Sequence, residues 1–211
     1  IAFQIGIKPA ARTTCVKPAG TTSLAVGTSS GIHAWHNDYY IRRIRVGKNE
    51  AIYNYLAANI PELIEDDKFR PHDTAIISVP QKAPEGAITR HESALDLLKR
   101  VKGVSDTWIQ GGHQNGHNTH NVSATITIKP DEWEDVGEWM WLNRECYNGL
   151  SVLPYTDHTY VQAPFEDCTK EDYDTLLSFV KRIDLDLITE DQDDTNLSGE
   201  LACAGGSCEI F

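Results

Sequence analysis

The chain has 211 residues and is 40% hydrophobic, which is enough for one large domain or for a substantial piece of a bigger one. Its formal net charge is −12, with acidity concentrated at residues 62–67 and 184–194, so a surface that binds nucleic acid is not expected. No apolar run approaches the length of a bilayer span and the first residues lack the charged start of a signal peptide, so we expect a cytoplasmic protein without membrane contact.

The cysteines are consistent with this compartment. Their number, five, is odd, and Cys15, Cys146 and Cys168 are scattered singly along the chain. This distribution is typical of reduced thiols in a cytosolic protein. Cys203 and Cys208 stand apart as a pair near the end of the sequence.

The first predicted elements are extended. Residues 1–7 alternate isoleucine or phenylalanine with small or polar residues, which predicts a strand that stops at Pro9. Residues 12–16 are also β-prone, and they lead into the sequence Lys-Pro-Ala-Gly-Thr-Thr-Ser-Leu at residues 17–24. We therefore expect residues 17–24 to form the turn after an extended segment.

This turn is rich in hydroxyls and is organised around Pro18 and Gly20. Pro18 lacks a backbone donor, Gly20 permits close approach or a positive φ, and the hydroxyls precede a short helix predicted to begin near Leu24. The first N–H groups of a helix have no internal partner and carry the positive end of its dipole. The sequence is therefore compatible with an anion-binding turn, and equally with a plain strand-to-helix turn that carries an N-cap.

A flexible turn at residues 27–33 precedes a predicted strand at residues 39–46. Ile41, Arg43 and Arg45 share one face of that strand, because successive side chains alternate between faces. Arginines at the centre of a strand are costly unless they are solvated or paired. Two interpretations remain open, a solvated edge strand with mixed faces or charge placed around an anionic ligand.

The middle of the chain alternates helices with a short strand. Residues 49–59 carry a helical pattern, and residues 93–102 form a clear amphipathic helix that Gly103 is expected to end. Between these helices, residues 74–79 form an apolar strand that we expect to end at Pro80.

Residues 111–121 contain three glycines and three histidines without periodicity, which predicts a loop. The histidines have no fixed helical spacing and no nearby cysteines or carboxylates. Side chains that line a pocket or are exposed are therefore favoured over a zinc site, and we assign no metal.

Residues 122–128 alternate as a strand, and Pro130 opens a helix after it. The apolar stripe of this helix includes Trp133, Val136, Met140 and Trp141. Because the tryptophans of this helix recur at helical spacing, we expect them in a core rather than on a stacking platform.

A further strand at residues 150–153 precedes a helix that Thr169 is expected to cap. Strands separated by helices are typical of βα units. The sequence therefore predicts an α/β fold with a largely parallel sheet.

The last residues form a separate region. Residues 191–199 are acidic and lack a core, which predicts a flexible linker. Four small residues separate Cys203 from Cys208, so the two sulfurs can reach disulfide distance. An accessible, mobile dithiol suits thiol–disulfide exchange better than half of a zinc site.

Taken in order, several segments resemble the C-terminal third of adenosylcobalamin-dependent (class II) ribonucleotide reductases, most closely their ribonucleoside-triphosphate reductase branch. The resemblance covers essentially the whole chain. The segments that carry it are residues 17–23, 39–46, 120–123 and 153–164, together with Cys203 and Cys208.

The resemblance implies a fold and a division of the chain. Residues 1–190 are expected to form the C-terminal part of a ten-stranded α/β barrel, made of two antiparallel half-barrels. Residues 191–211 are expected to form the flexible acidic linker and a redox-active dithiol tail.

The resemblance also implies a substrate site. In it, Ala19, Gly20, Thr21 and Thr22 hold the phosphates of a ribonucleotide through backbone amides and hydroxyls, and Ser23 completes the candidate set. Position 19 is more often serine in this family. Because Ala19 loses that hydroxyl but keeps its N–H, weakened rather than abolished phosphate binding is expected.

For the cofactor and partners, the resemblance implies adenosylcobalamin, which generates the radical together with the remainder of the enzyme. It also implies that Cys203 and Cys208 return electrons to the active site and are re-reduced by thioredoxin or a similar donor. The residues that contact cobalamin are not among those that the resemblance identifies.

One element of the family is missing from these residues. The radical cysteine of the family lies in the pattern Asn-x-Cys-x-Glu, which does not occur here, and residues 143–147 do not fit it. We therefore expect an N-terminal part of the reductase to act with this chain. The alternative is a freestanding nucleotide-phosphate-binding module without catalysis.

Overall fold

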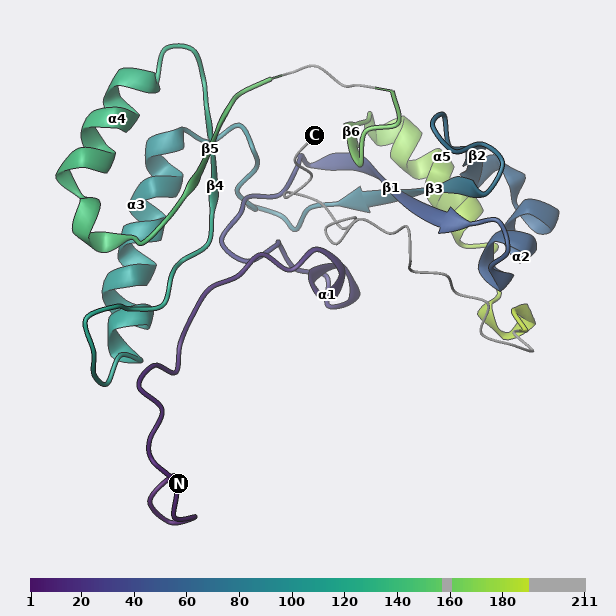
Figure 1. Ribbon diagram of the computed structural model, residues 1–211. Coiled ribbons are helices and arrows are strands. Elements are labelled where there is room, and N and C mark those ends of the chain that lie inside the picture. Colours follow the sequence, from purple (N-terminus) through teal and green to yellow (C-terminus); the bar gives the residue numbers. More distant parts are fainter. Residues whose placement is uncertain (157–160, 190–211) are drawn as a thin grey trace. The chain divides into compact units, whose positions relative to one another are not determined.

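The computed structural model describes residues 1–156 and 161–189 (Figure 1). The described residues divide into two compact units, the first formed by residues 1–34 and 91–156 and the second by residues 35–90 and 161–189. The predicted linker and the pair Cys203 and Cys208 lie outside the described residues. Within the described part of the chain, every helix is too short or too polar to cross a membrane.

The first unit packs helices on a small parallel sheet. Its strands β4 (Thr125–Ile128) and β5 (Ser151–Pro154) pair in parallel. In Figure 1, the helices α3 (Ala94–Val104) and α4 (Trp133–Leu142) lie in the same unit as this sheet. The core between them consists mainly of aliphatic side chains, among them Leu98, Val101, Ile126, Ile128 and Val136.

Helix α3 begins where the sequence predicts. Ser93 is its N-cap, and the Ser93 hydroxyl accepts a hydrogen bond of 3.1 Å from the amide of Asp96. The prediction that Gly103 ends the helix is wrong, because the chain continues to Val104 and then as one π-helical turn, Ser105–Ile109. Ile109 is fully buried in the core, and the burial of its side chain stabilises the helical segment that continues past the glycine.

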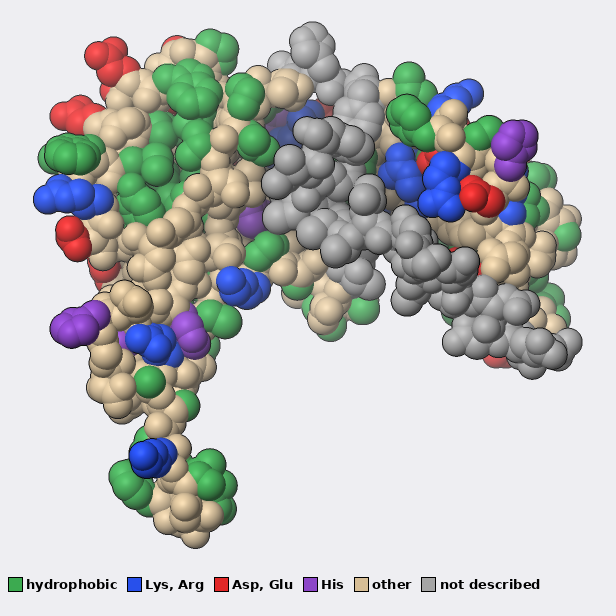
Figure 2. Space-filling model, in the orientation of Figure 1, with side chains coloured by type: hydrophobic (Ala, Val, Ile, Leu, Met, Phe, Trp, Pro, Cys, Tyr) green, Lys and Arg blue, Asp and Glu red, His purple; other side chains and the backbone are tan. Residues whose placement is uncertain are grey.

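Helix α4 differs from its predicted packing. Val136 is buried as expected, but Trp133 is 46% exposed and Trp141 is 70% exposed. Figure 2 shows hydrophobic side chains gathered at the surface of this unit, over α4 and β5. Helical spacing predicts a stripe of side chains, but it does not say whether another element covers that stripe.

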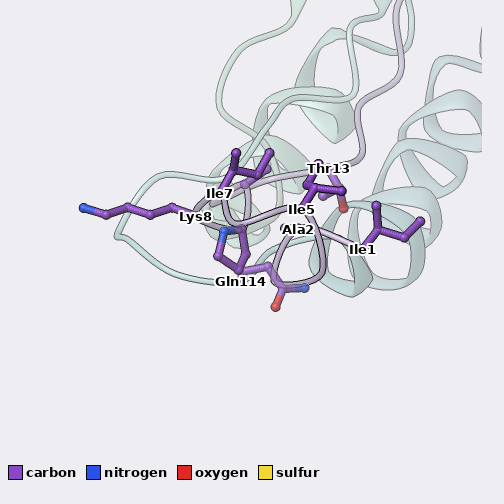
Figure 3. Close-up of a pocket in the computed structure, with 9 residues that line it drawn as sticks. Ile1, Ala2, Ile5, Ile7, Lys8, Thr13 and Gln114 are labelled. Atoms are coloured by element: carbon purple, nitrogen blue, oxygen red, sulfur yellow. The ribbon is translucent and has the colours of Figure 1, made fainter.

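The strand predicted for residues 1–7 is also wrong. These residues form turns, in which the amide of Ile5 donates to the carbonyl of Ile1 and the amide of Ile7 to that of Ala2. Without a neighbouring strand to pair with, an alternating pattern alone does not produce a strand. A hollow of about 480 Å³ lies beside this segment, and its lining includes Ile1, Ile5, Ile7, Pro9, Thr13 and Gln114. Figure 3 shows the side chains of Ile1, Ile5, Ile7 and Gln114 around it.

The second unit contains a four-stranded sheet in the order β2-β3-β1-β6. Its strands are β1 (Tyr39–Gly47), β2 (Ile64–Asp66), β3 (Thr74–Lys82) and β6 (Phe165–Asp167). All its pairings are antiparallel, so the prediction of a largely parallel sheet is wrong for this unit. Burial that alternates along β1 is typical of antiparallel strands. The order of strands and helices along the chain does not reveal this direction of pairing.

Strand β3 passes through Pro80, where the sequence predicts its end. The amide of Ala83 donates to the carbonyl of Asp38, which makes Asp38 and Ala83 a hydrogen-bonded pair of the ladder with β1. Such pairs alternate along the ladder, so Pro80, opposite Ile41, falls at a position that needs no N–H toward β1. The strand therefore continues to Lys82.

Helices α2 (Ala51–Asn59) and α5 (Lys170–Val180) complete this unit. The buried residues Leu56, Ile60 and Leu63 pack against side chains of both β3 and α5. The predicted cap of α5 is confirmed as a full capping box, since Thr169 and Asp172 each bond the other's backbone amide.

Candidate functional site

The hydroxyl-rich turn begins a helix earlier than expected. Helix α1 spans Gly20–Ala25, so it starts directly after Ala19 rather than near Leu24. Because the first amides of a helix have no carbonyl partner within it, the turn presents backbone N–H groups at Gly20 and the next residues. The observed start of α1 is thus compatible with the predicted anion-binding turn.

The side chain of Ser23 is placed differently from that of Thr22. Its side chain is buried, and its hydroxyl donates to the carbonyl of Ala19, with the Gly20 carbonyl oxygen at 3.2 Å. The Ser23 proton is therefore used inside α1. Thr22, by contrast, is exposed.

The turn at residues 27–33 packs against the hydroxyl-rich turn. The amide of Ala19 donates to the Ser30 hydroxyl over 2.9 Å. Gly31 has a φ of +60°, and a Cβ added there would lie 2.6 Å from the Lys17 carbonyl oxygen and 3.3 Å from the Pro18 Cα. The two turns therefore pack backbone against backbone, at a position that only glycine fills without strain.

The segment that leads into β4 also contacts the hydroxyl-rich turn. Val16 forms a parallel bridge with Val122, in which the amide of Ser123 donates to the Val16 carbonyl over 2.9 Å. The exposed Lys17 ammonium donates to the Ser123 hydroxyl at 3.3 Å. Within the described part of the chain Lys17 forms no ion pair, so its charge adds to the positive potential at the turn.

The glycine- and histidine-rich loop packs on residues 12–14. The amide of Thr13 donates to the Gly112 carbonyl over 2.9 Å, and the Nδ1 atom of His120 lies 2.9 Å from the Thr14 carbonyl oxygen. A Cβ added at Gly112 would overlap the Thr14 side chain. Among the described residues no three His, Cys, Asp or Glu side chains converge as a metal site.

Two arginines of β1, Arg43 and Arg45, are paired with carboxylates inside the second unit. Arg43 contacts Glu65 at 3.4 Å and Glu166 at 2.5 Å, and Arg45 contacts Asp67 at 2.8 Å. Because β1 lies between β3 and β6, the interpretation as a solvated edge strand is wrong. The pairing favours a structural role for these charges over a role at an anionic ligand.

Asp67 is the most enclosed of these carboxylates, with a side chain that is 3% exposed. Burial alone raises the pKa of Asp67, but the backbone amides of Arg70 and Phe69 and the guanidinium of Arg45 more than offset it, and the pKa is lowered. The carboxylate is therefore charged at neutral pH and accepts hydrogen bonds from these three donors.

The described cysteines are free thiols. Burial raises the pKa of Cys146 and of Cys168, and nearby carboxylates raise that of Cys168 further. A raised pKa reduces the thiolate fraction, so both thiols suit packing better than nucleophilic chemistry. Cys15 is exposed, and the proposed redox pair lies outside the described residues.

No family model matches the chain. Curated relatives named adenosylcobalamin-dependent ribonucleoside-triphosphate reductase are 26% identical over 98% of the chain in Levilactobacillus brevis and 28% identical over 83% in Euglena gracilis. The chain spans about a quarter of their length, 27% and 23% respectively.

The structural comparison agrees. A crystal structure of a B12-dependent (class II) ribonucleotide reductase superposes with a TM-score of 0.70 and 26% identity, covering 85% of this chain and 24% of that one. The resemblance inferred from the sequence is therefore confirmed, and so is the α/β class of the fold.

Proposed function

We propose that this chain is part of an adenosylcobalamin-dependent ribonucleotide reductase, which converts ribonucleoside triphosphates, or diphosphates, to deoxyribonucleotides by radical chemistry. The observation that carries the proposal is similarity over 98% of the chain to reductases of that name. Because the chain spans 27% of such a relative, the proposed enzyme includes a further part that carries the radical cysteine.

In this proposal the turn at residues 17–23 binds the substrate phosphates. The amides of Gly20, Thr21 and Thr22 lie in the first turn of α1, where they have no partner within the helix. Ala19 offers an amide and Ser23 a hydroxyl that both already have partners, so these two candidates shape the turn at least as much as they contact the ligand. Lys17 supplies the nearby positive charge.

The strands β4 and β5 are proposed to belong to the ten-stranded barrel of the complete enzyme. They are parallel, and β5 pairs only with β4 among the described strands, so further strands can join the sheet there. The exposed apolar side chains nearby, which include Trp141, Leu142 and Leu153, are surfaces that the remainder of the enzyme is proposed to cover.

Adenosylcobalamin is proposed as the cofactor of the complete enzyme, in which it supplies the radical. We assign no residue of this chain to a contact with the cofactor and attribute no step to it here. This chain's own residues bind and orient the substrate phosphates.

Cys203 and Cys208 are proposed as the redox tail. Their two thiols give up two electrons and two protons to the active-site disulfide by thiol–disulfide exchange, which reduces that disulfide and oxidises the tail. A dithiol donor such as thioredoxin then reduces the tail again. Small residues between the two cysteines support this role, since they leave both sulfurs free to meet.

Co-expression tests the proposal. The chain is produced together with a polypeptide that carries Asn-x-Cys-x-Glu, and the pair is assayed for deoxyribonucleotide formation with and without adenosylcobalamin. We expect association, a gain in stability on pairing and cobalamin-dependent product. A chain that is a monodisperse, cooperatively unfolding monomer and ignores the second polypeptide would contradict the proposal. If such a monomer still binds nucleotides, it is the phosphate-binding module without catalysis.

A further inference from the structure

The turn at residues 27–33 is joined to the proposed phosphate-binding turn, residues 17–23, by a continuous series of hydrogen bonds. The amide of Ala19 donates to the Ser30 hydroxyl over 2.9 Å, and the Ser30 carbonyl oxygen lies 2.9 Å from Nδ1 of His33. The Nε2 atom of His33 lies 2.9 Å from the amide nitrogen of Thr125, the first residue of β4. The series therefore links the turn at residues 17–23 to the parallel sheet of the same unit.

The donors in this series determine the state of the imidazole. A backbone amide only donates, so Nε2 of His33 must accept from Thr125. The remaining proton of a neutral imidazole then sits on Nδ1, from which it is donated to the Ser30 carbonyl. Both ring nitrogens are thus used, and the ring is held from two sides.

We propose that Ser30 and His33 are positioning residues for the phosphate turn at residues 17–23. His33 acts through Ser30, and Ser30 acts through the amide of Ala19, the residue directly before α1. A helix of six residues is too short to fix its own start, so the tie to β4 determines where the first amides of α1 lie. This inference rests on the proposed function of the turn.

The variants separate the links of the series. Ser30→Ala removes the acceptor for the Ala19 amide, whereas Ser30→Thr retains a hydroxyl there. His33→Asn retains a donor where Nδ1 lies, and His33→Gln retains an acceptor where Nε2 lies. Ser29→Ala is the matched control, because the Ser29 side chain forms no hydrogen bond within the described part of the chain.

Hydrogen exchange of the Ala19 amide in the full chain, followed by NMR, tests the contact itself. Ser30→Ala is expected to lower the protection of this amide about fivefold, the equilibrium factor of one net hydrogen bond. Ser30→Thr and Ser29→Ala are expected to leave it within a factor of two. Equal protection in Ser30→Ala and Ser29→Ala overturns the inference.

Kinetics of the reconstituted reductase test the role. We expect Ser30→Ala and both His33 variants to raise KM for the nucleotide several-fold with little change in kcat, since binding and not the radical step is affected. Unchanged KM in Ser30→Ala overturns the inference.

The proposed function has its own readout. Inorganic triphosphate is titrated into the unsubstituted chain, and shifts of the amides of Lys17 and of residues 19–23 are expected. If none shifts, the proposed function of the turn fails, and with it the positioning role, even where Ser30 still protects the Ala19 amide. If they shift equally in Ser30→Ala, the function stands and the positioning role is overturned.

Discussion

Replacing Gly31 by alanine tests the contact between the two turns most directly, because a matched control exists in the same turn. Gly31 and Gly27 both have positive φ values, +60° and +64°. A Cβ at Gly31 would lie 2.6 Å from the Lys17 carbonyl oxygen, whereas a Cβ at Gly27 would meet nothing within 4 Å. The two substitutions therefore share the conformational cost and differ in the contact.

The shared term is the cost of a left-handed conformation for alanine, about 1 to 2 kcal/mol. At Gly31 the Lys17 backbone must also move by about 0.8 Å to restore the 3.4 Å of ordinary contact. Forcing one extra carbon into a packed region costs about 1 to 3 kcal/mol. We expect the unfolding free energy to fall by about 1 to 2 kcal/mol in Gly27→Ala and by about 2 to 5 kcal/mol in Gly31→Ala.

Urea unfolding followed by tryptophan fluorescence measures this difference. Four of the five tryptophans, Trp108, Trp133, Trp139 and Trp141, belong to the first unit, so the signal reports mainly on the unit that contains both glycines. We also expect Gly31→Ala, but not Gly27→Ala, to weaken nucleotide binding by the reconstituted enzyme. Equal losses of stability in the two variants would refute the contact between Gly31 and Lys17.

The remaining predictions concern the turn at residues 17–23, Asp67 of the second unit, and the pair Cys203 and Cys208. Gly20→Val is expected to weaken nucleotide binding by the reconstituted enzyme more than tenfold, about 1.4 kcal/mol, and unchanged affinity in equilibrium binding would remove this turn from the site. Folding lowers the pKa of Asp67 from its ordinary 3.8, so the stabilisation that its carboxylate gives the fold is complete above that value and is lost as pH falls through the folded pKa. Urea titrations between pH 5 and 2, read by circular dichroism, should therefore show an unfolding free energy that depends less on pH in Asp67→Asn than in the unsubstituted chain. Identical slopes would contradict this. Cys203→Ser with Cys208→Ser should abolish sustained turnover with thioredoxin but spare a single turnover of pre-reduced enzyme, and a small dithiol should restore activity; full thioredoxin-supported turnover would exclude the tail as electron carrier.

Elements with a strong local signal could be predicted from the sequence. The strand at residues 39–46 and the helix capped by Thr169 both occur, because alternation and a capping box act between residues close in the chain. Pairing of strands is not local. Whether β1 lies at an edge, and whether its neighbours run parallel, depends on residues 74–82 and 165–167, which no periodicity within β1 specifies.

The partners of charged and aromatic side chains could not be predicted either, because they too depend on residues that lie far away in the sequence. Arg45 lies 22 positions before Asp67, so the sequence shows a costly arginine but not the carboxylate that pairs with it. Trp141 has the helical spacing of a core residue and yet is exposed, with the guanidinium of Arg144 over its ring in place of a buried apolar neighbour. Composition indicates which groups need a partner, and only the fold identifies it.

The candidate site contains both features with a local sequence signal and contacts between residues far apart in the sequence. The turn at residues 17–24 was found from its chemistry, but Ser30 and His33 were missed because their bonds to Ala19 and Thr125 span 11 and 92 positions. A boundary error of four residues changed the role of Ser23. If α1 began near Leu24, Ser23 would be a free hydroxyl of the turn; since it begins at Gly20, the Ser23 hydroxyl reaches the carbonyl one helical turn earlier, as serine does inside helices. The substitution Ser23→Ala should therefore affect the stability of α1 more than the affinity for phosphate, whereas Thr22→Ala should do the reverse.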